Sequence, residues 1–288
     1  MFLNMKTTVL IFLFLVLIGN PLKAECLTNE KIVEIINGSP YSPIEGISAD
    51  ISLEEAYCSQ KKYVKILTKS MGKPIGYKVG FTGKATQERF KIKTPATGVL
   101  FKPMFIKNGS TISRDFGHRT LIEPDLMVVV KDSKIMESTT QLGAAKYLDT
   151  IHPFMELPAL QIKKGEPITG AVIVAINMVA TKMVMGPGIP IQANQEFIDA
   201  MGEMETIFSD ENNKVIQNAP GSSLLGNPMN VVLWLIKEFN KRGITLQSGD
   251  RLSLGSVGKL FPLESNKIYT YTLSGLPGGP SSTNVIIK

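Results

Sequence analysis

The chain of 288 residues is poor in the side chains that carry out nucleophilic and thiol chemistry. It contains two histidines, His118 and His152, and two cysteines, Cys26 and Cys58. A Ser-His-Asp or Cys-His relay needs a histidine to take the proton of the nucleophile, and no G-x-S-x-G elbow accompanies either histidine. The sequence also lacks zinc-finger spacing and any phosphate-loop or dinucleotide fingerprint. These absences leave carboxylates and lysines as the groups able to carry chemistry.

The charge pattern argues against a nucleic-acid partner. The formal net charge is +6, but the lysines are scattered and do not alternate with aromatic residues along any stripe. A hydrophobic content of 43%, with both charge signs mixed, is typical of a globular protein with a real core, folded as one domain or two.

The first 24 residues differ from the rest. Lys6 precedes the apolar run "VLIFLFLVLIG", a Gly/Pro break follows, and Leu22 and Ala24 occupy the −3 and −1 positions of a cleavage site. This order is typical of a secretory signal peptide, and the run is too short for a comfortable membrane span. An uncleaved anchor is the alternative. We expect a periplasmic or secreted protein that begins at Glu25 and has no stable membrane insertion after cleavage.

The two cysteines are predicted to pair. In an exported protein an even number of cysteines suggests a disulfide, here between Cys26 and Cys58. Two free thiols are the alternative.

Few helices and many short strands are expected. Residues 53–72 have helical spacing and a capping-box pattern at Ser52 and Glu55, and residues 227–243 form a second helix. Residues 196–208 are ambiguous, with helical spacing first and strand-like spacing later. Strands are expected within 74–82, 97–105, 121–130, 171–179, 250–257 and 267–276.

These elements predict an α+β fold with a strongly curved or rolled sheet. The expected organisation is a signal peptide (1–24), a short helical N-terminal part (25–72) and one β-rich body (73–288).

Three carboxylates stand where a charge needs a partner. Glu123 and Asp125 are two apart in the strand-like run "LIEPDLMVVV", so they share one face of a strand. Glu156 sits in the apolar run "IHPFMELPAL". Three converging carboxylates match a hard divalent ion such as Mg²⁺ or Mn²⁺. Capping by Arg119, Lys131 or backbone amides is the alternative.

A lysine accompanies them in "GYKVGFT". Beside a metal-bound oxo acid, the Lys78 ammonium would hold a carboxylate or move a proton. The alternative is an ordinary strand lysine.

These segments, in this order, resemble the fumarylacetoacetate hydrolase superfamily, and within it the 2-keto-4-pentenoate hydratase and 4-oxalocrotonate decarboxylase branch. The resemblance covers most of the chain after residue 24. It is carried by "ISADISLEEAYCSQ", "GYKVGFT", "TPATGVLF", "IEPDLMVVV", "PFMELP", "LLGNPMNVVLWL" and "GDRLSLGSVG".

The resemblance implies a rolled β fold that carries Mg²⁺ or Mn²⁺ on Glu123, Asp125 and Glu156. It implies a small 2-oxo acid substrate and a metal-stabilised enolate, which serves hydration, decarboxylation or C–C cleavage alike. Lys78 would be the acid/base or the clamp on the substrate carboxylate, and Asn177 would contact substrate. The implied activity is that of a hydro-lyase.

The chain departs from the branch at several positions. Asp125 stands for the usual Glu, Ala96 and Ile176 stand where the branch has Asp, Asn227 replaces a His, and Leu254 replaces a Thr. Two interpretations therefore stay open. One is a metal-dependent 2-oxo acid enzyme, a hydratase before a decarboxylase or hydrolase. The other is a non-catalytic exported protein that binds a small acid. Either is compatible with a homo-oligomer.

Overall fold

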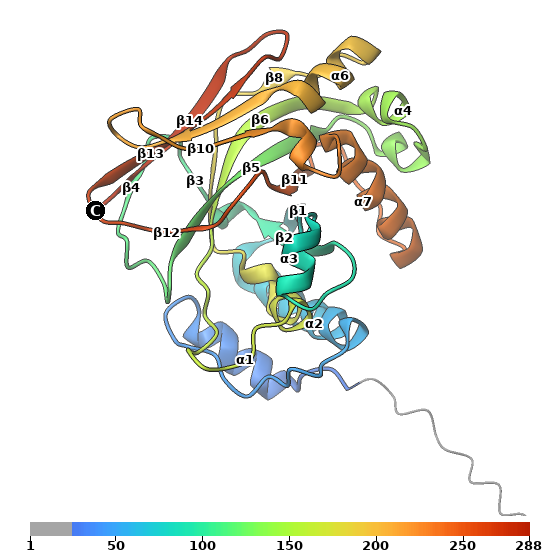
Figure 1. The fold of residues 1–288 in the computed structure, drawn as a ribbon. Coiled ribbons are helices and arrows are strands. Elements are labelled where there is room, and N and C mark those ends of the chain that lie inside the picture. The colour runs from blue at the N-terminus through green and yellow to red at the C-terminus, as the bar shows by residue number, and fades with distance from the viewer. Residues whose placement is uncertain (1–24) are drawn as a thin grey trace, which may run out of the picture.

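A curved mixed sheet of nine strands forms the centre of the molecule (Figure 1). The structure is a computed structural model that describes residues 25–288; the predicted signal peptide, 1–24, lies outside the described residues. Seven strands follow the order β2-β1-β11-β5-β6-β7-β3, while β12 pairs with β5 and β8 with β6. The strands of this sheet are β1 (Pro74–Gly80), β2 (Ala96–Phe101), β3 (Phe105–Ile106), β5 (Leu121–Val130), β6 (Leu148–Leu157), β7 (Lys182–Met185), β8 (Ile189–Pro190), β11 (Arg251–Ser256) and β12 (Phe261–Pro262).

A second sheet of five strands has the order β10-β9-β13-β14-β4. Its strands are β4 (Thr111–Ile112), β9 (Glu205–Ser209), β10 (Val215–Pro220), β13 (Lys267–Ser274) and β14 (Ser281–Ile287). The helices of the described part are α1 (Asn29–Gly38), α2 (Leu53–Met71), α3 (Lys84–Arg89), α4 (Gln141–Ala145), α5 (Gly170–Ala175), α6 (Gln195–Glu203) and α7 (Pro228–Arg242), with 3-10 turns at Lys102–Met104, Ser133–Glu137, Asn177–Val179 and Gly221–Ser223.

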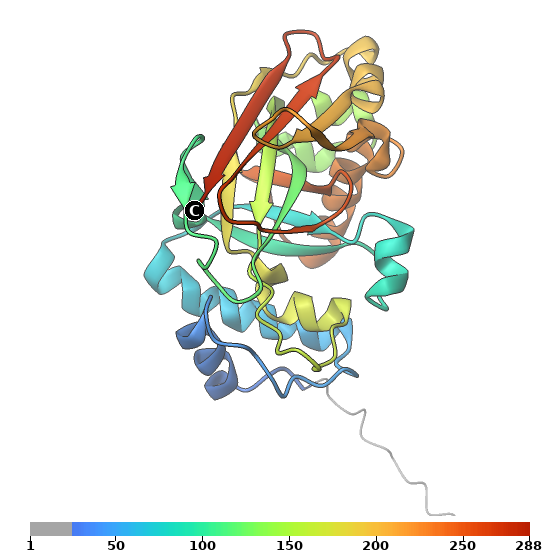
Figure 2. The same cartoon turned by 60° about the vertical axis from the view of Figure 1, so that its left-hand side comes forward.

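The large sheet separates two hydrophobic cores. On one face, α1, α2 and α5 pack over side chains such as Met127, Phe154 and Met183. On the other face, the second sheet and helices α4, α6 and α7 pack over alternate residues such as Leu126 and Val128. Figure 2 shows this division, with the blue N-terminal helices on one side and the red strands β13 and β14 on the other. Successive strand residues alternate between these cores, because side chains in a strand point to opposite faces.

A disulfide fixes the N-terminal part to this layer. Cys26 is bonded to Cys58 of α2, with Cα atoms 5.5 Å apart, which confirms the predicted pairing. The Leu27 amide also donates to Ser59 Oγ at 2.9 Å, and Lys62 Nζ donates to the Leu27 carbonyl. Closing a loop of this length stabilises a fold by about 3 to 4 kcal/mol on the chain-entropy description.

Most expected elements are confirmed. The α+β class is correct, and helices occupy 53–71 and 228–242, the first with the Ser52–Glu55 capping box in place. The ambiguous stretch contains both elements in turn, α6 followed by β9. Among residues 25–288, no helix combines the length and apolar character that a membrane crossing requires.

The strand predicted at 171–179 is wrong. This β-branched run forms α5 and a 3-10 turn instead. Thr169 caps the helix by accepting from the Val172 amide, and α5 packs against α2 within the helix-side core. The local preference of Val and Ile for strands is weak compared with the burial that this packing provides.

Candidate active site

The three predicted carboxylates lie on the helix-facing side of the large sheet. Glu123 and Glu156 are directly opposite each other across the β5–β6 ladder, and Asp125 lies two residues further along β5. All three are buried, with exposed fractions of 9% for Glu123, 1% for Asp125 and 2% for Glu156. The ladder therefore brings Glu156 beside two acids, although it lies 33 positions after Glu123 in the sequence.

Lys78 reaches the same group from β1. It forms a buried ion pair with Glu156, and its ammonium also donates to the Met178 carbonyl at 3.3 Å. Strand β11 lies between β1 and β5, and its Ser253 pairs with Lys78 on one side and Met127 on the other. The strand order, rather than closeness in sequence, is what places the lysine beside the acids.

Ser253 joins two of the acids, and sequence reasoning missed it. Its hydroxyl lies 2.7 Å from Asp125 Oδ2 and 3.1 Å from Glu156 Oε1. A hydroxyl has one proton, so it donates to one carboxylate at a time. Asp125 Oδ1 meanwhile accepts from the Gly255 amide at 3.0 Å. The available signal was a serine between two leucines, Leu252 and Leu254, in a predicted strand.

The site carries an excess of negative charge. Burial, followed by the charge of Glu156, raises the pKa of Glu123 to about 8. The same two causes raise the pKa of Asp125. Burial lowers the pKa of Lys78, but the three surrounding carboxylates outweigh it, so the Lys78 pKa is raised and the ammonium stays protonated. One ammonium therefore faces three acids that resist ionising together.

A cavity of about 240 Å³ opens over part of this group. Glu123 and Lys78 line it, whereas Asp125 and Glu156 do not, and neither histidine does. The hydroxyl of Ser256, also in the lining, is buried and makes no well-formed hydrogen bond, but it lies near enough to Glu123 to lower the pKa of that carboxyl slightly against the larger effect of burial. The remaining wall is formed by apolar side chains and by residues near α3, including Phe81, Phe90, Val179 and Leu260. The cavity is smaller than drug-binding pockets and suits a small molecule.

A strained turn forms one side of this cavity. Asn177, Met178 and Val179 all have left-handed φ values, of 56°, 56° and 50°. Such a conformation costs about 1–2 kcal/mol per L-residue and is rare for a β-branched one. The turn aims the Met178 carbonyl at Lys78 and places Met178 and Val179 in the cavity wall. Gly98 makes room for it, since a Cβ there would approach Met178 Cβ to 2.8 Å.

The structure does not place the Asn177 side chain in the cavity. Its amide oxygen accepts from the Val99 backbone at 2.7 Å, and its amide nitrogen donates to the Val99 carbonyl at 2.9 Å. Asn177 is 1% exposed, and its side-chain amide bonds both backbone groups of Val99, as a neighbouring strand would at the edge of β2. The observed role is to hold the strained turn.

The positions that depart from the branch also lie outside the cavity lining. Ala96 and Ile176 are buried in the helix-side core, with 0% and 3% exposure, and Leu254 is buried on the opposite face. Asn227 caps α7, accepting from the Met229 amide. An aspartate at 96 or 176 would be a charge inside an apolar cluster.

The donor set fits a divalent cation in its chemistry. Glu123, Asp125 and Glu156 offer hard oxygen atoms and a surplus of negative charge on one face, which is what Mg²⁺, Mn²⁺ and Ca²⁺ prefer. In the described arrangement, however, Lys78 and Ser253 engage the oxygens of Glu156 and Asp125. Accordingly, no three His, Cys, Asp or Glu side chains within 25–288 are already arranged as metal ligands. Holding an ion on all three acids requires these side chains to reorient.

Comparison with known proteins gives consistent relatives, although no family model matches the chain. A 2-keto-4-pentenoate hydratase of Paraburkholderia xenovorans (strain LB400) is 21% identical over 240 residues, covering 83% of this chain and 87% of its own. A 2-oxo-hept-4-ene-1,7-dioate hydratase of Escherichia coli is 25% identical over 227 residues, covering 76% of this chain and 83% of its own.

Solved structures share the fold. The 4-oxalocrotonate decarboxylase of Pseudomonas putida G7, complexed with magnesium and adipate, superposes with a TM-score of 0.78 at 19% identity over 92% of this chain and all of its own. The fumarylpyruvate hydrolase of Pseudomonas aeruginosa, in complex with Mn²⁺ and pyruvate, gives 0.53 at 13% identity over 74% of this chain and 89% of its own.

The solved structures show that this chain shares the rolled fold of the 4-oxalocrotonate decarboxylase and, more distantly, of the fumarylpyruvate hydrolase. The sequence relatives support the resemblance to the 2-keto-4-pentenoate hydratase and 4-oxalocrotonate decarboxylase branch that the sequence motifs predict. The names of the sequence relatives also support the prediction of a hydro-lyase-like enzyme.

Proposed function

We propose that the protein is a hydratase that adds water to a small unsaturated 2-oxo acid and uses Mg²⁺ or Mn²⁺. The observation that carries this proposal is the placement of Lys78 and Glu123 together in a cavity of about 240 Å³, with Glu156 paired to Lys78 behind the wall. Its relatives in sequence are named hydratases of such acids.

The described residues divide the work. Lys78 is a buried ammonium, so it can hold the substrate carboxylate or deliver a proton. The hydroxyl of Ser256 can donate to a substrate oxygen at the cavity wall. Glu123, Asp125 and Glu156 would hold the cation, which when bound supplies positive charge that polarises a keto group and offsets charge developing on its oxygen. The apolar side chains beside Lys78 and Glu123 lower the local dielectric constant and so strengthen these interactions.

Hydration and decarboxylation are separated by their products. Purified protein should consume 2-hydroxypenta-2,4-dienoate with loss of its ultraviolet absorbance in the presence of Mg²⁺ or Mn²⁺, and excess EDTA should stop the reaction. Release of CO₂ from oxaloacetate or a related acid, without dienoate hydration, would assign decarboxylation instead. Turnover that EDTA leaves unchanged would contradict metal dependence.

We propose further that the protein is exported and that its mature form begins at Glu25. The order of charged, apolar and small residues in 1–24 supports this, and so does the Cys26–Cys58 disulfide, because such bonds persist in oxidising compartments. Mass spectrometry of protein recovered from the periplasm or medium should give Glu25 as the first residue. An intact Met1 in the membrane fraction would contradict export by cleavage.

A further inference from the structure

The cavity is divided by polarity. Its charged side chains, Lys78 and Glu123, come from neighbouring parts of the large sheet, and Ser256 at the end of β11 adds a hydroxyl beside them. Among the described residues that line the cavity, Lys78 is the cation, and it is already paired with Glu156. The lining therefore offers one cationic side chain that a substrate carboxylate can approach, and no second one at a distance from it.

The rest of the wall carries no charge: it is mostly apolar, with the hydroxyl-bearing residues Thr82, Thr86 and Ser223. Phe81 and Phe90, which flank α3, pack with ring centroids 5.5 Å apart, and both line the cavity. Leu260, in the segment between β11 and β12, also lines it and is 46% exposed. An exposed leucine beside a pair of aromatic rings forms an apolar surface that a hydrocarbon chain would cover.

We propose that the substrate carries a single carboxylate, at its 2-oxo end, and an uncharged hydrocarbon tail that lies against Phe81, Phe90 and Leu260. A carboxylate at the far end of the substrate would lie against this apolar wall without a cation in the lining, and burying an unpaired charge is unfavourable. The inference rests on the proposed function for the 2-oxo acid head group, and it excludes dicarboxylates as preferred substrates.

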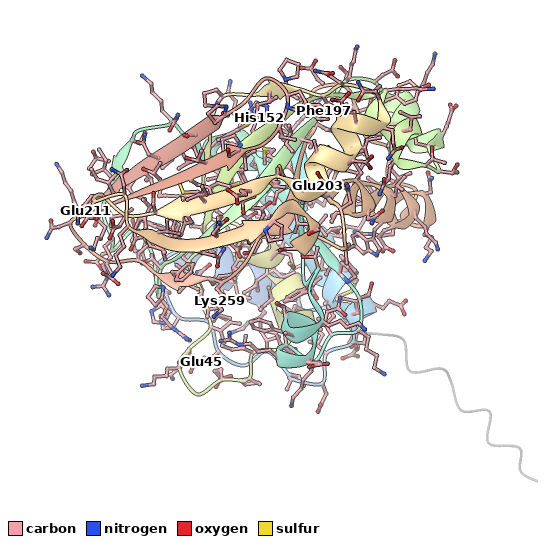
Figure 3. All side chains as sticks on the ribbon, turned by 45° about the horizontal axis from the view of Figure 1, so that its top comes forward. Glu45, His152, Phe197, Glu203, Glu211 and Lys259 are labelled. Atoms are coloured by element: carbon pink, nitrogen blue, oxygen red, sulfur yellow. A yellow bond between two sulfur atoms is a disulfide. The ribbon has the colours of Figure 1, made fainter. Side chains whose placement is uncertain are left out.

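Two exposed lysines lie close to the cavity without lining it. Lys84 follows the lining residue Gly83, and Lys259, labelled in Figure 3, precedes Leu260. Both are solvated, and attraction from a solvated lysine is weak and screened by salt. A substitution of Lys259 tests whether a lysine outside the lining contributes to recognition of the far end of the substrate.

The test uses two acids of equal length. Binding of 2-oxohexanoate and 2-oxoadipate, which differ at the far end by a methyl group against a carboxylate, is measured by calorimetry in the presence of Mn²⁺, with pyruvate as the head group alone. We expect 2-oxohexanoate to bind at least tenfold more tightly than 2-oxoadipate. Equal or tighter binding of 2-oxoadipate overturns the inference. Binding of none of the three acids overturns the proposed function, and the inference with it.

Substitutions in the wall and outside it sharpen the result. Phe90→Ala should weaken the binding of 2-oxohexanoate about tenfold and leave the binding of pyruvate unchanged. Leu260→Lys should reduce or reverse the difference in affinity between 2-oxohexanoate and 2-oxoadipate. Lys259→Ala is the matched control and should leave the preference as it is. If the wild type prefers 2-oxoadipate and Lys259→Ala removes that preference, the exposed lysine determines selectivity and the apolar-wall inference is wrong.

Discussion

Replacing Glu156 by glutamine should abolish metal-dependent turnover while leaving the fold intact. Glu156 is central to the acidic group: it faces Glu123 across the ladder, pairs with Lys78 and accepts from Ser253. The substitution removes one charged ligand but keeps the shape, and it relieves repulsion among buried carboxylates. Activity should fall below detection, and the circular dichroism spectrum should be unchanged. Turnover within tenfold of the wild type would show that Glu156 is not part of the reaction centre.

The same variant should change how stability depends on pH. The pKa of Glu123 is about 8 in the folded protein against 4.5 ordinarily, so the folded state binds the extra proton and stability falls as pH rises from about 4.5 to 8. Glu156 is the second cause of this shift. The melting temperature of Glu156→Gln should therefore fall less than that of the wild type between pH 6 and 9 in EDTA. Stabilisation by Mn²⁺ should be reduced in the variant.

Glu45→Gln provides a matched control for the Glu156 substitution. Glu45 is an exposed glutamate, labelled in Figure 3, that pairs with Lys163 at the surface. Exposed pairs contribute little to stability, so this variant should keep wild-type turnover and wild-type pH dependence. A similar loss in Glu45→Gln would point to a general effect of removing a carboxylate.

Replacing Lys78 by alanine should produce the second-largest effect. If the ammonium delivers a proton, kcat should fall by about two to four decades. If it only holds the substrate carboxylate, KM should rise while kcat stays close to the wild type. Its raised pKa means that it begins as an acid at neutral pH. Unchanged kcat and KM would remove Lys78 from the mechanism.

The Lys78 substitution also tests whether this lysine competes with the metal. Its ammonium already engages Glu156, so an ion held by Glu156 must displace or share that contact. Lys78→Met, which keeps the bulk but removes the charge, should therefore bind Mn²⁺ more tightly than the wild type in calorimetry. Weaker binding would mean that the lysine supports the ligand arrangement. Lys163→Ala, at the exposed pair with Glu45, is the control.

The sequence predicts the chemistry of the site better than its arrangement. The spacing of Glu123 and Asp125 shows that they share a strand face, because side chains alternate along a strand. The register that sets Glu156 opposite Glu123 is a tertiary fact that spacing does not contain. Strand β11 lies between β1 and β5 and brings Ser253 to the site, and the sequence alone does not predict this strand order.

The error at residues 171–179 has the same origin. Its β-branched residues favour a strand locally, and the packing of α5 against α2 overrides that preference. The expected substrate contact of Asn177 came from the family resemblance, which does not contain the local packing of this chain. In the observed turn the amide instead bonds both backbone groups of Val99.

The left-handed turn at Asn177–Val179 bears on how this enzyme can diversify. It presents one carbonyl to Lys78 and two side chains to the cavity, all through one backbone segment. A substitution there changes both the environment of the Lys78 ammonium and the shape of the cavity, so the two properties cannot change independently. Phe90 and Leu260 line the cavity from other segments and make no hydrogen bond to Lys78. New tail preferences should therefore arise first at those two positions, in laboratory selection as in natural descent.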